Sequence, residues 1–583
     1  MKKLVSRFMA VLMAMTMILS MSMTAFAAEA PKGTLTVNNT VAEKTLDLYQ
    51  IFTATKSGEN VAYTLNSAYK GFFQNKISGA STLTGEALSE KAYEYVQKQV
   101  GTNGDAETAK TFAKDMLGWI LDSNNNITVT KTVETTATST VVSDLAYGYY
   151  LVYPKGATDT SKAPGNQTYT SAASLVSITA ETATINMKSN YPTVDKKIIP
   201  AQSGSGAKVD AIVNDNWENV SHMGLDEDDE NESEDTIAPR GAADEKKAGD
   251  FGIGDTVTYQ LTSKVPDMTG YNSYTFKFSD TLSNGLDLKE VLSVKVGNTT
   301  LTAKKTGANT YALAYDQAKR TLTVTLNDFY NSYKNRTGET ITVVYTATLN
   351  KDAVIGMNPN TNKAVVEYSN DPKSTGTGTS EPSIVDAHTF DFTIYKYYLK
   401  NQNKIALANA EFELYKANTE GTAADTNAMI KIVDEKNGVY RQATPEEAKV
   451  TDFTSAKIVS DDADGKVLVK GLDAGTYYLR ETKAPEGYNK LLSDIKVEIK
   501  PVYDETTGKL TSYSVDYTYN GKTTNGTAIT NKTDSPEVAV ENKTGAQLPS
   551  TGARTALLLT LAGVVLFAFM AASSIYSKRR EAR

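Results

Sequence analysis

Most of the chain alternates between apolar and polar residues with a period of two, which is typical of half-buried β-strands. The pattern begins at Leu35 and Val37 and returns between residues 46 and 51. Two segments differ, because residues 89–100 and 106–121 carry apolar side chains at helical spacing. The sequence therefore predicts a mainly β protein with helices added to its first part. It predicts further strands over residues 256–263, 274–278, 321–326, 339–349, 364–368, 392–396, 410–415, 475–481, 495–499 and 538–542.

The length of the chain indicates several domains, because 583 residues are too many for one hydrophobic core. We expect an N-terminal α+β domain over residues 30–190, a central β-sandwich over 191–388 and a C-terminal β-sandwich over 389–545. The central domain contains a dense acidic run within residues 214–247. Like charges repel and bury no apolar surface, so a solvated loop is predicted there. An EF-hand would need spaced ligands and a central glycine, and this run has neither. We therefore expect no metal there, and we expect no cofactor.

Both ends of the chain carry sorting patterns. A basic start, an apolar run over residues 8–23 and Ala25-Phe26-Ala27 predict a signal peptide over residues 1–28. The C-terminal residues 548–583 begin with Leu548-Pro549-Ser550-Thr551-Gly552, followed by an apolar stretch and a basic tail. That stretch predicts a transmembrane segment over residues 556–576, because its length matches a hydrocarbon core of roughly 30 Å. The basic tail should stay on the cytoplasmic side.

The C-terminal arrangement resembles the sorting signal of Gram-positive surface proteins that sortases process. The resemblance implies cleavage between Thr551 and Gly552, with Thr551 as the acyl donor. The hydrophobic tail would then be lost. It also implies a secreted chain that becomes covalently attached to the cell wall at the bacterial surface.

Composition excludes several classes of function. The net charge is -8, which argues against nucleic acid as a partner. There is no cysteine, and the only histidines are His222 and His388, so neither Cys-His nor Ser-His catalysis has a well-placed base. We therefore expect no enzyme. A wall-attached glycoside hydrolase is a remote alternative, since no segment singles out a pair among the 68 acidic residues.

Residues 478–488, Tyr-Leu-Arg-Glu-Thr-Lys-Ala-Pro-Glu-Gly-Tyr, form a second distinctive motif. They resemble the E-box of pilins and of the B-type repeats of collagen adhesins. In that family the Glu promotes an amide bond between a Lys on the first strand and an Asn on the last strand of one domain. The matching positions here are Glu481, Lys396 and Asn542, with Asn531 as a competing acceptor.

Strand periodicity supports this assignment. Phe392, Ile394 and Lys396 share one face of their strand, so Lys396 is buried if Ile394 is buried. Burial lowers the pKa of an amine and raises that of a carboxyl group, which leaves a neutral nucleophile beside a protonated acid. The alternative is that Lys396 reaches solvent and Asn542 merely ends a strand.

The central domain offers a similar set. Lys196 alternates onto one face with its apolar neighbours, and near the other end of the domain Asn362 and Asn370 lie on a common face. Residues 252–259 resemble the strand that supplies the acid in the central domain of shaft pilins. The resemblance suggests a bond from Lys196 to Asn362 with Asp255 as the catalytic acid, and Asn370 as the alternative acceptor. The alternative is that Lys196 and Asp255 form only a structural ion pair, without a covalent bond.

Taken together, these segments resemble a sortase-assembled backbone (shaft) pilin with tandem immunoglobulin-like, Cna-type β-sandwich domains. A shaft pilin needs an acceptor lysine, and Tyr153-Pro154-Lys155 matches the tripeptide of the pilin motif. The usual Trp is absent and the tripeptide lies about 40 residues before the expected domain boundary, so Lys188 and Lys197 stay open as alternatives.

The resemblance also implies the partners. They are a class C pilin sortase and a housekeeping sortase, other copies of the chain, minor pilins, peptidoglycan, and a host or microbial ligand that the sequence does not identify. The function expected is structural, with adhesion as the cellular outcome. A monomeric wall-anchored adhesin is the nearest alternative, because it shares these domains and lacks only the acceptor lysine.

Overall fold

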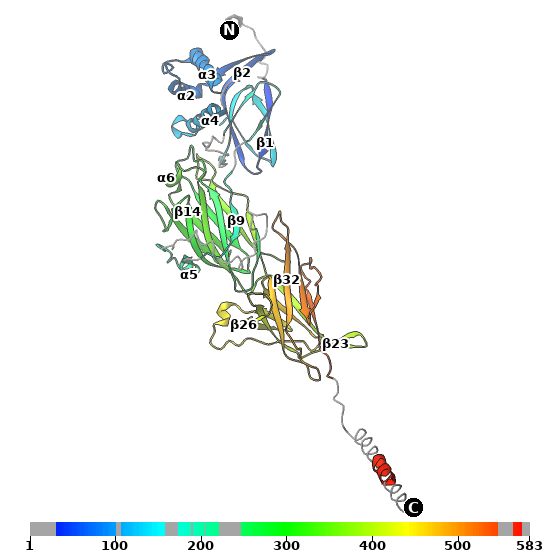
Figure 1. Ribbon diagram of the computed structural model, residues 1–583. Coiled ribbons are helices and arrows are strands. Elements are labelled where there is room, and N and C mark those ends of the chain that lie inside the picture. Colours follow the sequence, from blue (N-terminus) through cyan, green and yellow to red (C-terminus); the bar gives the residue numbers. More distant parts are fainter. Residues whose placement is uncertain are drawn as a thin grey trace, which may run out of the picture.

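The computed structural model describes residues 31–100, 106–157, 173–187, 191–202, 205–220, 247–545 and 564–573. Three β-rich bodies follow one another along the molecule in chain order, and the helices α2, α3 and α4 lie to one side of the first body (Figure 1). The fold is mainly β, as the alternating pattern predicts.

The first body has two sheets, ordered β5-β1-β8 and β3-β2-β6-β7, with β4 paired to β2. Both predicted helices are present, and Phe112, Met116 and Ile120 of α4 are buried as their spacing requires. The elements are β1 Lys32–Thr40, β2 Thr45–Ser57, β3 Asn60–Leu65, η1 Ser67–Tyr69, α2 Lys70–Lys76, α3 Gly85–Val100, α4 Ala106–Leu121, η2 Ser123–Asn125, β4 Lys131–Glu134, β5 Thr138–Ala146, β6 Gly148–Pro154, β7 Ser174–Ile178 and β8 Thr182–Asn186.

The second body is a sandwich of two sheets, ordered β10-β14-β19-β12-β9 and β11-β22-β20-β13-β18-β17-β16, with β15 and β21 added at β14 and β20. One core joins them, in which Tyr259 of the first sheet and Val366 of the second are fully buried. The elements are β9 Asp195–Ile199, β10 Ala207–Lys208, α5 Val209–Val213, β11 Ala248–Asp250, β12 Thr256–Lys264, β13 Phe276–Leu282, β14 Leu286–Val296, β15 Thr299–Thr300, β16 Thr302–Ala303, β17 Thr310–Asp316, β18 Thr321–Leu326, α6 Phe329–Tyr333, β19 Thr340–Leu349, β20 Asn360–Ser369, β21 Thr377–Thr379 and β22 Ser383–His388.

In the described part of the segment predicted as a solvated loop, residues 214–216, 218 and 219 are exposed, but Trp217 is not. Trp217 is 2% exposed and belongs to the core of the second body. The prediction is wrong there, because one large apolar side chain outweighs its polar neighbours. The acidic run itself lies outside the described residues.

The third body also consists of two sheets, ordered β24-β23-β30-β28-β27 and β26-β25-β31-β32-β33-β34. β29 pairs with β25, and the last strand, β35, runs parallel to the first, β23. The elements are β23 Phe390–Lys400, β24 Asn403–Ala406, β25 Glu411–Ala417, β26 Ala424–Met429, β27 Ile432–Lys436, β28 Val439–Gln442, α7 Pro445–Ala448, β29 Ile458–Val459, β30 Lys466–Leu472, β31 Gly475–Lys483, β32 Ile495–Tyr503, β33 Leu510–Tyr519, β34 Lys522–Thr524 and β35 Glu537–Glu541.

Near the C-terminus, the short helix over residues 564–573 is exposed along its whole length. Among the residues that the structure describes, no helix is both long enough and apolar enough to cross a membrane. Most of the predicted transmembrane segment lies outside that part of the chain, as do the signal peptide and residues 548–552.

Candidate functional site

A lysine, a glutamate and an asparagine meet inside the third body. Lys396 lies on β23, Glu481 on β31, and Asn542 directly follows β35. Lys396 Nζ is 3.0 Å from Glu481 Oε1, and neither side chain has any exposed surface. Asn542 Nδ2 donates to Glu481 Oε2 at 3.3 Å and to the backbone oxygen of Asn489 at 2.7 Å. One carboxylate therefore contacts both the amine and the amide.

Backbone pairing explains this convergence. β35 lies beside β23 with Lys396 opposite Val540, and the Asn542 backbone NH donates to the Tyr397 carbonyl at 2.9 Å. Asn542 continues the buried alternation of Val538 and Val540, as the period-two pattern predicts. The first and last strands of the body are thus neighbours with their polar core residues on the same side.

The electrostatics of the pocket favour a reactive amine. Burial lowers the pKa of Lys396 from 10.5 to about 8, against the opposing effect of Glu481. About one such amine in ten is then neutral at pH 7. Among the described residues, no group donates a hydrogen bond to the buried Asn542 Oδ1. The buried site thus holds the Lys396 amine, the Glu481 carboxyl group and an Asn542 carbonyl oxygen that accepts no hydrogen bond from the described residues.

The second body contains a related cluster of four residues. Lys196 on β9 and Asp280 on β13 form a short, fully buried ion pair. The Tyr345 hydroxyl on β19 accepts from Lys196 Nζ at 2.6 Å and donates to Asp280 Oδ2 at 2.9 Å. Asn362 on β20 donates from Nδ2 to the same hydroxyl at 2.6 Å. All four side chains are buried, and the cluster joins both sheets of the sandwich.

Burial shifts both charged groups of this cluster toward their neutral forms. It lowers the pKa of Lys196 to about 8 and raises that of Asp280, although each group partly offsets the shift of the other. Lys196 Nζ also lies 4.7 Å and 5.0 Å from the ring centres of Tyr259 and Tyr345. The amine is therefore held between two aromatic faces next to an acid.

The expected placement of Asp255 beside Lys196 is wrong. Lys196 pairs with Leu261 on β12, whereas Asp255 precedes β12, six residues and roughly 20 Å away along the strand. Asp255 instead accepts from the Gly252 backbone NH at 2.7 Å near the third body. Burial, with a contribution from Asp473 of that body, raises the pKa of Asp255 to about 6.

Asp280 and Tyr345 are the two members of the cluster that the sequence analysis missed. Asp280 could have been found from the sequence, because it shares one face of β13 with Phe276 and Phe278. A single carboxylate on an apolar strand face is unusual. Tyr345 carries no such signal, since tyrosine is common on buried strand faces and only the fold shows what its hydroxyl contacts.

The alternative acceptors lie elsewhere. Asn370 donates from Nδ2 to the Thr377 carbonyl at 3.1 Å near the surface. Asn531 is exposed and pairs with Asp534 at 3.0 Å. Asn362 and Asn542 are therefore the asparagines that the fold brings to the buried lysines.

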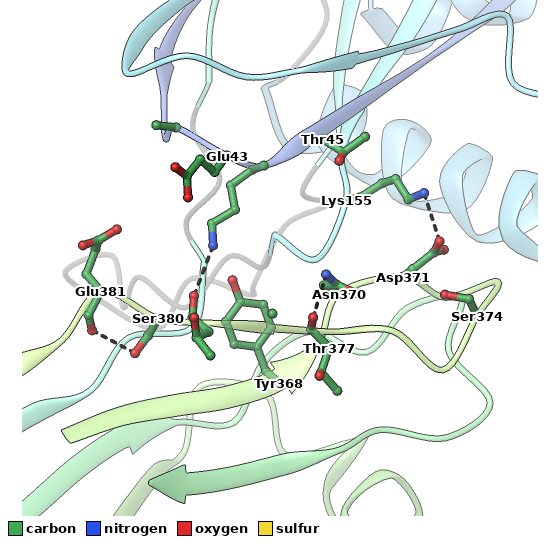
Figure 2. A pocket seen from close by; sticks show the side chains of 14 residues that line it. Glu43, Thr45, Lys155, Tyr368, Asn370, Asp371, Ser374, Thr377, Ser380 and Glu381 are labelled. Carbon is green, nitrogen blue, oxygen red and sulfur yellow. Dashed lines mark hydrogen bonds and ion pairs between the residues drawn. The ribbon is translucent and has the colours of Figure 1, made fainter. Parts of the chain in front are cut away.

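Lys155 lies in a polar cavity of about 540 Å³ between the first and second bodies. Its Nζ is 2.9 Å from Asp371 of the second body, and this contact links the two bodies (Figure 2). The same nitrogen lies 3.8 Å from Asp47 of the first body. Burial lowers its pKa, but the bond to Asp371 and the charge of Asp47 outweigh that effect and raise it. Lys197 is partly exposed beside Asp195, and Lys188 lies outside the described residues.

Of the two histidines in the chain, only His388 lies within the described residues. His388 is buried and lies 3.4 Å from the Gly356 carbonyl, where burial lowers its pKa. His222 lies outside the described residues. In the part of the chain that the structure describes, no group of three acidic or histidine side chains could hold a metal ion.

Three family models match different parts of the chain. The Gram-positive pilin backbone subunit 2, a Cna-B-like domain, matches residues 253–372. A prealbumin-like fold domain matches residues 391–514, and the LPXTG cell wall anchor motif matches residues 540–582. The first two contain the acids of the two clusters, Asp280 and Glu481.

Similar solved structures are also pilins. The T6 backbone pilin of serotype M6 Streptococcus pyogenes is 14% identical, covers 89% of this chain and 100% of its own, and has a TM-score of 0.42. The major pilin SpaA of Corynebacterium diphtheriae is 13% identical, covers 87% of this chain and 99% of its own, and has a TM-score of 0.39. The pilus 2b backbone protein of group B streptococcus is 24% identical, covers 54% of this chain and 99% of its own, and has a TM-score of 0.35.

No curated protein matches the chain. The order of a pilin backbone domain, a prealbumin-like domain and an LPXTG anchor agrees with the β-sandwich bodies and with the C-terminal pentapeptide. The chain therefore carries a domain of the Gram-positive pilin backbone subunits together with an LPXTG anchor, which indicates a surface protein attached to the cell wall.

Proposed function

We propose that this chain is the repeating shaft subunit of a covalently polymerised pilus, and that each copy is strengthened by two internal Lys–Asn amide bonds. The three bodies would be the domains 30–190, 191–388 and 389–545. The observation that carries the proposal is the buried set of Lys396, Glu481 and Asn542, which joins the first and last strands of the body next to the cell wall anchor.

The bond needs no external reagent. The neutral Lys396 amine attacks the Asn542 side-chain carbonyl carbon, one proton passes from Nζ to the departing nitrogen, and ammonia leaves as the amide forms. Glu481 contacts both nitrogens and can carry that proton. Folding holds the reactants in contact, which can be worth roughly 7 to 11 kcal/mol of the barrier. In the second body, Lys196, Asn362 and Asp280 would do the same.

These bonds would stabilise a chain that has no disulfide. Lys396 and Asn542 enclose about 150 residues, and closing a loop of that length is worth on the order of 5 kcal/mol in the unfolded state. Since β23 and β35 carry the two ends of the body, a bond between them lets a pulling force pass directly from one end to the other. The rest of the sandwich is then not peeled open.

Polymerisation would join Thr551 of one subunit to a lysine of the next. A class C pilin sortase would form the shaft, a housekeeping sortase would attach it to peptidoglycan, and minor pilins would share the fibre. Among the acceptor candidates, Lys155 is held as a charged amine between two carboxylates, which must release it before it can attack. Replacing Lys155, Lys188 and Lys197 by Arg one at a time would identify the acceptor.

Cell-wall extracts test the polymer. We expect a ladder of multimers that resists boiling in detergent, and peptide mapping should find Thr551 joined to one lysine. A single band would support the alternative of a monomeric wall-anchored adhesin. The intact mass of the folded ectodomain tests the internal bonds separately, because each bond lowers the mass by one ammonia. A wild-type protein with its full calculated mass would exclude both bonds.

A further inference from the structure

The two buried clusters differ in how the acid reaches the amide. In the third body, Glu481 contacts Lys396 through one oxygen and Asn542 through the other. In the second body, the acid is an aspartate, one methylene shorter. Its Oδ2 contacts Lys196 and the Tyr345 hydroxyl, and that hydroxyl in turn contacts Asn362. Tyr345 thus occupies the space between the acid and the amide.

We propose that Tyr345 is a catalytic residue of the central cross-link, where its hydroxyl carries the proton from Asp280 to the departing nitrogen of Asn362. The inference rests on the proposed Lys196–Asn362 bond and adds a residue to its mechanism. The third body has no equivalent, because there Asn542 Nδ2 faces the backbone carbonyl of Asn489, which has no proton to give.

The proton balance of the step is complete. Nζ of Lys196 forms a bond to the side-chain carbonyl carbon of Asn362 and passes one proton to the Asp280 carboxylate. Asp280 returns that proton to the Tyr345 oxygen while the hydroxyl gives its own proton to Nδ2. The bond between the carbonyl carbon and Nδ2 then breaks and ammonia leaves. Asp280 and Tyr345 end in the states in which they began.

The surroundings of the hydroxyl suit this role. Tyr345 has no exposed surface, and its ring stacks on that of Tyr259 with centres 5.3 Å apart, so its position is fixed by packing. Burial keeps the hydroxyl protonated by raising its pKa well above the ordinary value of 10. Among the described residues, nothing donates to Asn362 Oδ1 and Asp280 Oδ1 has no partner, so the hydroxyl is the observed link from the acid to the amide.

The test compares the two bonds within one molecule. The wild-type ectodomain and the Tyr345→Phe variant are made by cell-free synthesis, and samples are digested at intervals to measure each cross-linked peptide by mass spectrometry. We expect the Lys196–Asn362 bond to form about a hundredfold more slowly in the variant or more slowly still, as for the loss of an acid–base group. The Lys396–Asn542 bond should form at the wild-type rate and serve as the internal control.

Two further variants separate chemistry from packing. Tyr333→Phe removes another fully buried hydroxyl of the same core that has no partner among the described residues, and the bond should form at the wild-type rate. Fluorotyrosine at position 345 keeps the ring and makes the hydroxyl more acidic, so the rate should change while the fold stays intact. This second measurement decides the question if Tyr345→Phe fails to fold.

The outcomes distinguish the role of Tyr345 from the existence of the Lys196–Asn362 bond. If Tyr345→Phe or the fluorotyrosine protein forms the central bond at the wild-type rate, Tyr345 is only a packing residue. If the wild-type protein itself never yields the Lys196–Asn362 peptide, the proposed central cross-link fails and the role of Tyr345 fails with it.

Discussion

Lys396 Nζ lies 3.0 Å from Glu481 Oε1 in the third body, and both side chains are completely buried. A buried ion pair is weak evidence for stability, because desolvation offsets most of the attraction. Here the pair has a third member, Asn542, which carries no charge of its own and donates to the same carboxylate. The grouping is therefore what the proposed bond between amine and amide requires, whereas an ion pair alone would not need Asn542.

We predict that Glu481→Ala leaves the Lys396–Asn542 bond unformed. The variant should be heavier than expected from the substitution by the mass of one ammonia. Removing one partner of a buried pair also costs about 3 to 5 kcal/mol, so the melting temperature should fall clearly. Intact mass and thermal unfolding check both effects. Asn531→Ala is the control, since Asn531 is exposed, and its mass should differ from that of the wild type only by the substitution itself, with no ammonia regained.

The acid of the second body can be identified by a matched pair of variants. Asp280→Asn should abolish the Lys196–Asn362 bond, because it removes the carboxylate that contacts Lys196. Asp255→Asn should leave the bond intact, because Asp255 lies near the third body instead. Peptide mapping of both proteins is the measurement. A lost bond in the Asp255 variant would mean that our assignment of the acid is incorrect.

Bond formation should depend on pH through the amines. Burial lowers the pKa of Lys396 and of Lys196 to about 8, so below pH 8 the protonated fraction dominates and cannot attack. The rate should fall about tenfold per pH unit below 8 and level off above it. Protein recovered unfolded from inclusion bodies and refolded at different pH values would report this as loss of ammonia over time. A rate that does not vary between pH 6 and 8 would contradict the assignment.

The joint between the second and third bodies should be sensitive at Gly254. This residue has φ +95°, and a Cβ built there would lie 2.4 Å from Pro445 Cδ. Gly254→Ala should therefore cost about 1 to 3 kcal/mol and loosen the joint. Gly58→Ala is a suitable control, because Gly58 also has positive φ but has no atom within 4 Å of the added carbon. Thermal unfolding and small-angle scattering would compare the two variants.

The strands and the two long helices could be predicted because their signals are local. Alternation marks the buried face of a strand, and it correctly put Lys396 and Asn542 on buried faces. The same reasoning applied to β13 would have marked Asp280, whose burial follows the same period. Trp217 was mispredicted since its effect comes from contact with a distant core and not from its neighbours in sequence.

Motifs and strand periodicity were enough to predict the family resemblance, the order of the parts and the lysines and asparagines of the two clusters, since these signals depend only on nearby residues. The folded structure was needed to show that Asp280 is the acid beside Lys196 and that the Tyr345 hydroxyl lies between Asp280 and Asn362. These residues come from β9, β13, β19 and β20, and the pairing of strands across two sheets is a property of the whole fold. A period of two gives the face of each residue but not its neighbours across the sandwich.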